Sequence, residues 1–112
     1  MGVKADDYDK VCVLDITGDF SGENARAAAA ALDERIKGRR IVDVVVNLAK
    51  CPFIDSEGLE TLLNMKRQCE DMFGQIKLAC LEENCRTILQ MTRLEHRFET
   101  HDDLAAALKT MR

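Results

Sequence analysis

Residues 53–59 read Phe-Ile-Asp-Ser-Glu-Gly-Leu, and the pattern of the chain changes at this stretch. Before it, residues 41–48 form a short apolar run rich in β-branched side chains, which predicts a buried strand. After it, apolar residues recur at spacings of three, four and seven: Leu59, Leu62, Leu63, Cys69, Met72 and Phe73. This periodicity predicts an amphipathic helix over residues 56–73, docked on a sheet and ended by Gly74. Asp55 and Ser56 therefore mark the passage from strand to helix.

Ser56 has two interpretations at the start of this helix. It is an N-cap, a role in which Asp and Ser residues contribute about 1 kcal/mol each. Alternatively it is a regulated serine. A phosphate at a helix N-terminus meets free N–H groups and the positive end of the helix dipole, yet presents about two new negative charges to a partner. The two roles are compatible.

Gly58 lies just inside the same helix, where glycine costs about 1 kcal/mol relative to alanine and so needs a reason. One reason is access, because a residue without a side chain lets another backbone or a bulky phosphate group come close to Ser56. The other is close internal packing. The sequence leaves both open.

The size and charge of the chain exclude several classes of protein. Its 112 residues suit one domain, residues 1–112, with a single core. A net charge of -4 without a basic run argues against nucleic acid as a partner. No stretch has the apolar length of a signal peptide or a membrane span, so we expect a soluble cytoplasmic protein without membrane insertion. Five cysteines without a C-x-x-C pair predict free thiols rather than disulfides or a zinc site.

The rest of the chain alternates between strand and helix patterns. Apolar runs predict three more strands, over residues 11–17, 75–81 and 98–100, with Tyr8 in a weak strand before them. Helical patterns predict three more helices, from about residues 21–24 to Gly38, after a cap at Asn84, and over residues 104–111. This alternation predicts an α/β domain with a largely parallel sheet.

Candidate catalytic groups are few. Neither G-x-G-x-x-G nor G-x-x-x-x-G-K-[ST] occurs, so no nucleotide cofactor is expected. The carboxylates of Asp55, Glu57 and Glu60 are explained by favourable placement in a first helical turn. Cys51 is the most loop-like thiol, but the sequence identifies no partner for it. We therefore expect no enzyme, no metal site and no cofactor.

The stretch Ile54 to Leu59, after a Val-rich strand and with Gly18, Asp19 and Phe20 upstream, resembles a STAS domain of the bacterial anti-sigma factor antagonist type. The resemblance covers about residues 8–110. It implies an α/β domain with a mixed, mostly parallel sheet of four to five strands and about four flanking helices. It also implies that a partner kinase, itself an anti-sigma factor, phosphorylates Ser56. The unphosphorylated protein would bind that kinase and free the sigma factor, and a PP2C-type phosphatase would reset the serine.

Charge supplies a physical mechanism for such a switch. A neutral Ser56 at an exposed helix start can enter an interface, whereas a phosphate adds charge beside acidic residues that a partner must then desolvate or repel. The hypothetical binding face comprises the turn before the first helix, the turn at Ser56 and exposed positions of the following helix: Asp19, Phe20, Ser21, Asp55, Glu57, Gly58, Glu60, Thr61 and Asn64.

Two departures from the family pattern concern charge near Ser56. Many members carry Asp where Asn47 stands and a small residue where Glu57 stands. Asn47 removes a negative charge and Glu57 adds one beside the serine, which could weaken recognition by a kinase of the usual kind. Two alternatives therefore stay open. One is a constitutive scaffold or accessory subunit of a transporter or signalling complex, in which Ser56 is only a cap. The other is a small enzyme or redox protein that uses Cys51 or the carboxylates.

Overall fold

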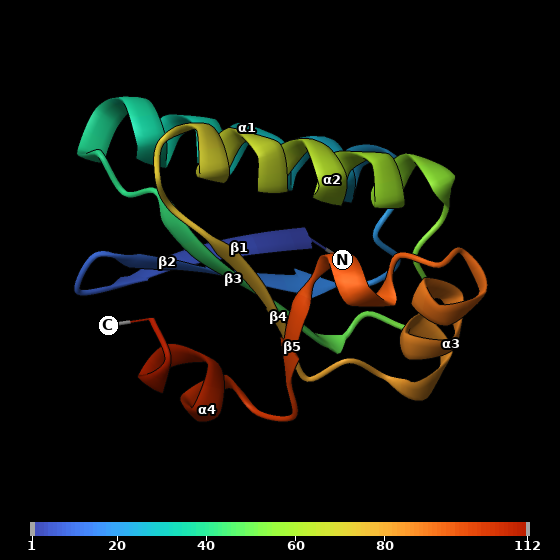
Figure 1. The fold of residues 1–112 in the computed structure, drawn as a ribbon. Helices are drawn as coiled ribbons and strands as arrows, with labels where there is room; N and C mark the ends of the chain where they lie inside the picture. Colours follow the sequence, from blue (N-terminus) through green and yellow to red (C-terminus); the bar gives the residue numbers. More distant parts are fainter. Residues whose placement is uncertain (1, 112) are drawn as a thin grey trace.

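One mixed β-sheet organises the computed structural model, which describes residues 2–111 (Figure 1). Its strands lie in the order of the sequence: β1 (Gly2–Tyr8), β2 (Val11–Thr17), β3 (Asp43–Lys50), β4 (Ile76–Ala79) and β5 (Glu99–His101). β1 is antiparallel to β2, and each later pair is parallel. The predicted α/β fold with a mixed, mostly parallel sheet is confirmed. The expected domain, residues 1–112, includes two terminal residues outside the described range.

Helices cover the two faces of the sheet unequally (Figure 1). α1 (Gly22–Arg39) and α2 (Ser56–Asp71) lie side by side across one face, and α3 (Glu83–Met91) lies at one end of the sheet, with Cys85 and Leu89 buried in the same core. The short α4 (Leu104–Lys109) lies on the opposite face. A one-turn 3₁₀ helix (Glu95–Arg97) precedes β5. Within residues 2–111, no helix combines the length and the apolar character needed to cross a membrane.

The central strands are apolar on both faces because both faces are covered. Cys12, Leu14 and Ile16 of β2 belong to the larger core under α1 and α2. Val11 and Val13 of the same strand belong to a smaller core that α4 covers. This double burial explains why the β2 and β3 sequences read as nearly continuous apolar runs.

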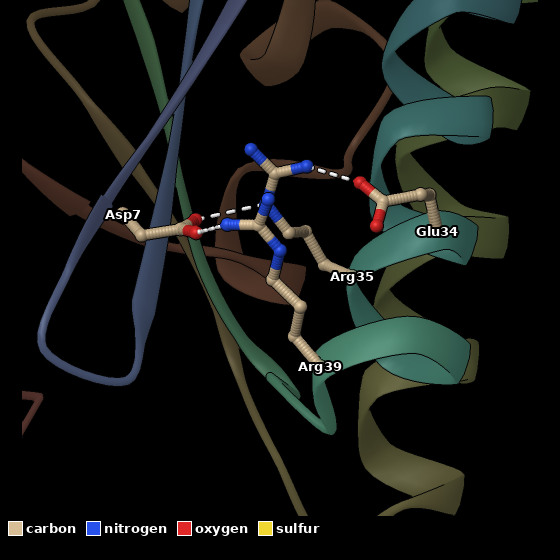
Figure 2. A network of polar contacts seen from close by, with 4 residues as sticks. All are labelled: Asp7, Glu34, Arg35 and Arg39. Carbon is tan, nitrogen blue, oxygen red and sulfur yellow. Dashed lines mark hydrogen bonds and ion pairs between the residues drawn. The ribbon is translucent and has the colours of Figure 1, made fainter.

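Strand β1 is longer than the weak strand expected around Tyr8. It pairs with β2 over its whole length, from Gly2 opposite Thr17 to Tyr8 opposite Val11. Its charged residues concealed it, because strands rich in Lys and Asp lack the usual β signal. At its end, Asp7 accepts a hydrogen bond from Arg35 Nε at 2.9 Å and pairs with Arg39, both on α1 (Figure 2). This network fastens the edge strand to the helix.

Helix α2 ends earlier than its sequence pattern suggests. It stops at Asp71, so Met72 and Phe73 are not on the buried face as predicted but are 50% and 100% exposed. Phe73 adopts a left-handed φ of 64°, and the Gly74 N–H donates to the carbonyl of Cys69 at 2.8 Å. These bonds satisfy the last carbonyls of the helix and turn the chain into β4.

Two other predicted helix boundaries were wrong. Gly38 does not stop α1, which continues to Arg39 and ends with Arg40 in the left-handed region. Asn84 does not cap α3, which begins after Glu82. The Asn84 side chain instead donates to the carbonyl of Pro52 at 2.8 Å and so ties α3 to the loop before α2.

Candidate functional site

Ser56 is the first residue of α2 and is exposed. The N-cap is Asp55, whose Oδ1 accepts a hydrogen bond from the Gly58 N–H at 2.8 Å. The interpretation of Ser56 as the cap was therefore wrong. Because Asp55 performs the capping, the Ser56 side chain is not needed to start the helix and is available to solvent.

The loop before α1 and the loop before α2 run side by side. The Phe20 N–H donates to the carbonyl of Phe53 at 2.9 Å, and Phe20 and Ile54 form a parallel bridge. The Gly18 N–H donates to the carbonyl of Lys50 at 3.0 Å. Segments about 35 residues apart in the chain are thus joined at one end of the sheet, and a hydrogen bond between Gly22 and Glu57, 35 residues apart, joins them as well. This pairing places the turn around Asp19 next to the turn around Ser56.

Close packing explains Gly58. A Cβ atom there would lie 2.0 Å from the carbonyl oxygen of Phe20 and 2.9 Å from Cγ2 of Ile54. Gly58 is itself buried. Of the two reasons left open by the sequence, internal packing is the one that the structure supports.

Two residues of the predicted binding face are buried, Phe20 and Gly58. Phe20 is completely buried in the larger core, so its side chain cannot meet a partner. It was expected at the surface because it stands in a turn, but the turn directs it inward beneath α1 and α2. Gly58 is also buried, so it contributes to the packing beneath this surface and cannot contact a partner. The other predicted residues are exposed or half-buried: Asp19, Ser21, Asp55, Glu57, Glu60, Thr61 and Asn64.

Glu57 joins the two helix starts. Its Oε1 accepts a hydrogen bond from the N–H of Gly22 at 3.1 Å, and its Oε2 pairs with Nη1 of Arg26 at 3.3 Å. Ser21, the N-cap of α1, makes no capping bond with its side chain. Glu57 therefore supplies to α1 the acceptor that Ser21 does not, and its charge is directed toward α1. Arg26 was missed by the sequence analysis, because the contact spans 31 residues.

Asn47 does not face Ser56. Its Nδ2 donates to Oδ1 of Asp15 at 2.7 Å, and its Oδ1 accepts from the N–H of Ala49 at 3.1 Å. In β3 it shares a face with Val45, which belongs to the core under α4, since residues two apart in a strand point the same way. Its amide therefore contributes to the opposite face of the sheet.

Phe53 is a second surface residue that the sequence analysis did not assign to the face. It is 44% exposed, lies three residues before Ser56 and follows the exposed Pro52. Its backbone carbonyl is held by Phe20, so the ring is presented from a fixed loop. The sequence did contain a signal for its exposure, because Phe53 directly follows Pro52 in the loop before α2.

Cys51 is buried beneath this loop. Its thiol donates to the carbonyl of Phe53 at 3.3 Å, and the thiol of Cys85 donates to the carbonyl of Cys51 at 3.2 Å. A hydrogen bond from the Cys85 thiol also lowers the pKa of Cys51. Complete burial removes Cys51 from any substrate in solution, which weighs against a nucleophilic role.

Comparisons with known proteins agree with the fold. Residues 3–107 match the family model described as the STAS domain. The fold is similar to that of several solved structures, among them the following three. A Thermotoga maritima protein described as an anti-sigma factor antagonist has a TM-score of 0.88 at 19% identity, covering 98% of this chain and 94% of its own. The Bacillus cell fate determinant SpoIIAA in its phosphorylated form has a TM-score of 0.78 at 17% identity, covering 98% and 99%.

The third, a sulfate transporter family protein from Wolinella succinogenes, has a TM-score of 0.76 at 16% identity, covering 93% and 86%. At these identities the likeness shows a shared fold. The comparison with curated proteins finds no match to the sequence.

Proposed function

Because this chain belongs to the STAS domain family, we propose that it is an anti-sigma factor antagonist that acts as a phosphorylation-controlled binding module. In this proposal the unphosphorylated protein binds an anti-sigma factor serine kinase in the cytoplasm and thereby releases the sigma factor. Phosphorylation of Ser56 ends that binding, and a PP2C-type phosphatase restores it. The kinase uses the ATP, so the chain itself needs no cofactor and performs no catalysis.

The observation that carries the proposal is the division of roles between Asp55 and Ser56. Asp55 caps α2, and Ser56 is exposed in the next position. A kinase can therefore modify Ser56 without removing the cap. The local N–H groups and the helix dipole tolerate the added phosphate within the domain. A partner that closes over Ser56 would have to desolvate this phosphate, and the cost of desolvating a buried charge can exceed the attraction to basic residues nearby.

Charge also favours a basic partner surface. Residues 18–26 and 52–64 carry one basic side chain, Arg26, beside five acidic ones: Asp19, Glu23, Asp55, Glu57 and Glu60. Phe53 stands among them as an exposed aromatic group. Interfaces of this kind place an aromatic anchor at the centre and charges at the rim. We therefore propose that the kinase offers an apolar pocket for Phe53 with basic residues around it.

The experiment that tests the switch compares the wild type with Ser56→Ala. Each protein is incubated with the cognate kinase and ATP, and its intact mass is measured. The wild type should gain the mass of one phosphate and lose kinase binding, while the variant gains nothing and stays bound. Equal masses after incubation would remove the regulated-serine role.

A second function is favoured by the fold similarity to the Wolinella succinogenes sulfate transporter family protein. In that case the chain would be a constitutive accessory subunit, and Ser56 would have no regulatory part. Binding of a transporter that is unchanged by Ser56→Asp would support it. Capture of partners from the native cell extract separates the two functions, since one predicts a kinase and the other a membrane transporter.

A further inference from the structure

We propose that Glu57 is a positioning residue that fastens the turn before α1 to the start of α2, and that a phosphate on Ser56 takes Arg26 away from it. The inference rests on the proposed function, because it states how the modification acts inside the domain. Phosphorylation would then change the arrangement of Glu57 and Arg26 as well as the charge of the surface.

The contact has the geometry of a two-point link. One carboxylate oxygen of Glu57 holds the Gly22 N–H and the other holds the Arg26 guanidinium. Both attachment points lie on α1, one at its first residue and one a full turn later. Glu57 itself lies in the first turn of α2. The link therefore fixes the spacing of the Asp19–Ser21 turn relative to Ser56.

The link is also weak enough to be broken. The side chains of Glu57 and Arg26 are 51% and 66% exposed, and exposed ion pairs contribute little to stability. A phosphate on the adjacent residue adds about two negative charges and three strong acceptors, which a guanidinium prefers over one carboxylate oxygen. Like-charge repulsion would at the same time push the Glu57 carboxylate away.

Arg26 has no basic competitor within the two facing segments. It is the one basic residue in residues 18–26 and 52–64, and its contact with Glu57 already holds its guanidinium at the first turn of α2, where Ser56 lies. The backbone bond between Phe20 and Phe53 and the contact at Gly58 do not involve these side chains. The architecture would thus persist while the turn around Asp19 loosens and Glu57 rotates outward. A partner that fits the surface held together by Glu57 and Arg26 would then meet a surface of different shape.

The test places phosphoserine at position 56 during translation, so that no kinase is required. Phosphorus NMR follows the titration of the phosphate in the wild type, in Arg26→Gln and in Lys37→Gln. The Lys37→Gln control removes an exposed charge from the last turn of the same helix. We expect Arg26→Gln to raise the titration midpoint by about half a pH unit, the size of an exposed ion pair, and Lys37→Gln to leave it unchanged.

The amide resonance of Gly22 gives a second readout. Phosphorylation of the wild type should move it toward the position seen in unphosphorylated Glu57→Ala, because both states lack the side-chain acceptor of the Gly22 N–H. Equal phosphate midpoints in the wild type and Arg26→Gln, or a Gly22 resonance indifferent to the phosphate, would overturn the inference. Neither result would affect the proposed function, which is decided by kinase binding and phosphorylation.

Discussion

Gly58 packs against the backbone of Phe20 so closely that a Cβ atom at position 58 would lie 2.0 Å from the Phe20 carbonyl oxygen. The contact is with backbone atoms of Phe20, and Gly58 is itself held in α2, so neither segment can move away easily. Gly58→Ala should therefore lower the free energy of unfolding by about 3 kcal/mol, the upper range for overpacking. Urea denaturation measures this.

Gly38→Ala is the matched control for that substitution. Gly38 is also helical, but a Cβ there meets the flexible end of Glu34 at 3.1 Å. The control should be neutral or stabilising by up to about 1 kcal/mol, because alanine favours helix. Equal effects of the two substitutions would show that helix propensity alone, rather than contact with Phe20, decides position 58.

The assignment of the cap to Asp55 predicts unequal effects at neighbouring positions. Asp55→Ala removes the acceptor of the Gly58 N–H and should cost about 1 kcal/mol of stability. Ser56→Ala should change stability by less than about 0.5 kcal/mol, as for other exposed positions. Thermal unfolding of both variants checks the difference. A larger loss with Ser56→Ala would return the capping role to the serine.

Which parts of the structure the sequence could predict depends on the range of the interactions. The runs at β2 and β3 and the helix after Ser56 were predictable because burial imposes local periods of two and 3.6 residues. The β1 strand was largely missed because its stability comes from pairing with β2 and from Asp7 contacts with α1, both distant in sequence.

The candidate site follows the same rule. Ser56 and its acidic neighbours were found from local spacing. The burial of Phe20 and the link from Glu57 to Arg26 arise where two loops meet, and one sequence contains no sign of that pairing. The exposure of Phe53 had one local signal, its place next to Pro52 in the loop before α2.

The Asp7 network predicts a specific dependence of stability on pH. The hydrogen bond from Arg35, assisted by Arg39, lowers the pKa of Asp7 below its ordinary value of 3.8. A carboxylate whose pKa is lower in the folded state stabilises the fold above the unfolded pKa, and this stabilisation is lost as the pH falls through the folded pKa. Asp7→Asn should therefore cost about 2 kcal/mol at pH 7, and the cost should shrink as the pH falls below about 3.8.

Asp9→Asn serves as the control for Asp7→Asn. Asp9 is exposed in the turn between β1 and β2 with a φ of 56°, a conformation that asparagine accepts. Asp9→Asn should change the free energy of unfolding, measured by urea denaturation, only slightly at both pH 7 and pH 3. A cost of Asp7→Asn that stays constant between pH 7 and pH 3 would contradict a charge-dependent role for the network.

Differences in burial predict that Cys12, Cys69 and Cys80 react with alkylating agents at different rates. Burial raises the pKa of Cys12 to about 11 and that of Cys69 to about 12, so neither forms a thiolate near neutral pH. Cys80 is the one free cysteine among the described residues that is only half-buried. With iodoacetamide at pH 8, Cys80 should be alkylated first and the other two only on unfolding. Peptide mapping by mass spectrometry follows the order, and early labelling of Cys12 would show that the larger core opens readily.

The proposed partner surface predicts that two exposed phenylalanines behave differently. Phe53 precedes Ser56, whereas Phe73 follows the opposite end of α2 and is fully exposed. If Phe53 is the aromatic anchor, Phe53→Ser should weaken binding of the unphosphorylated protein to its kinase at least tenfold, about 1.4 kcal/mol.

Phe73→Ser removes a similar exposed ring at the far end of α2, and kinase affinity should not change. Calorimetric titration with the purified kinase measures both variants, and thermal unfolding checks that each is folded. The Phe53 carbonyl bond to Phe20 is a backbone contact, so Phe53→Ser leaves it in place. Equal losses of affinity would mean that the kinase responds to surface apolarity in general, and a loss confined to Phe73→Ser would place the interface at the other end of α2.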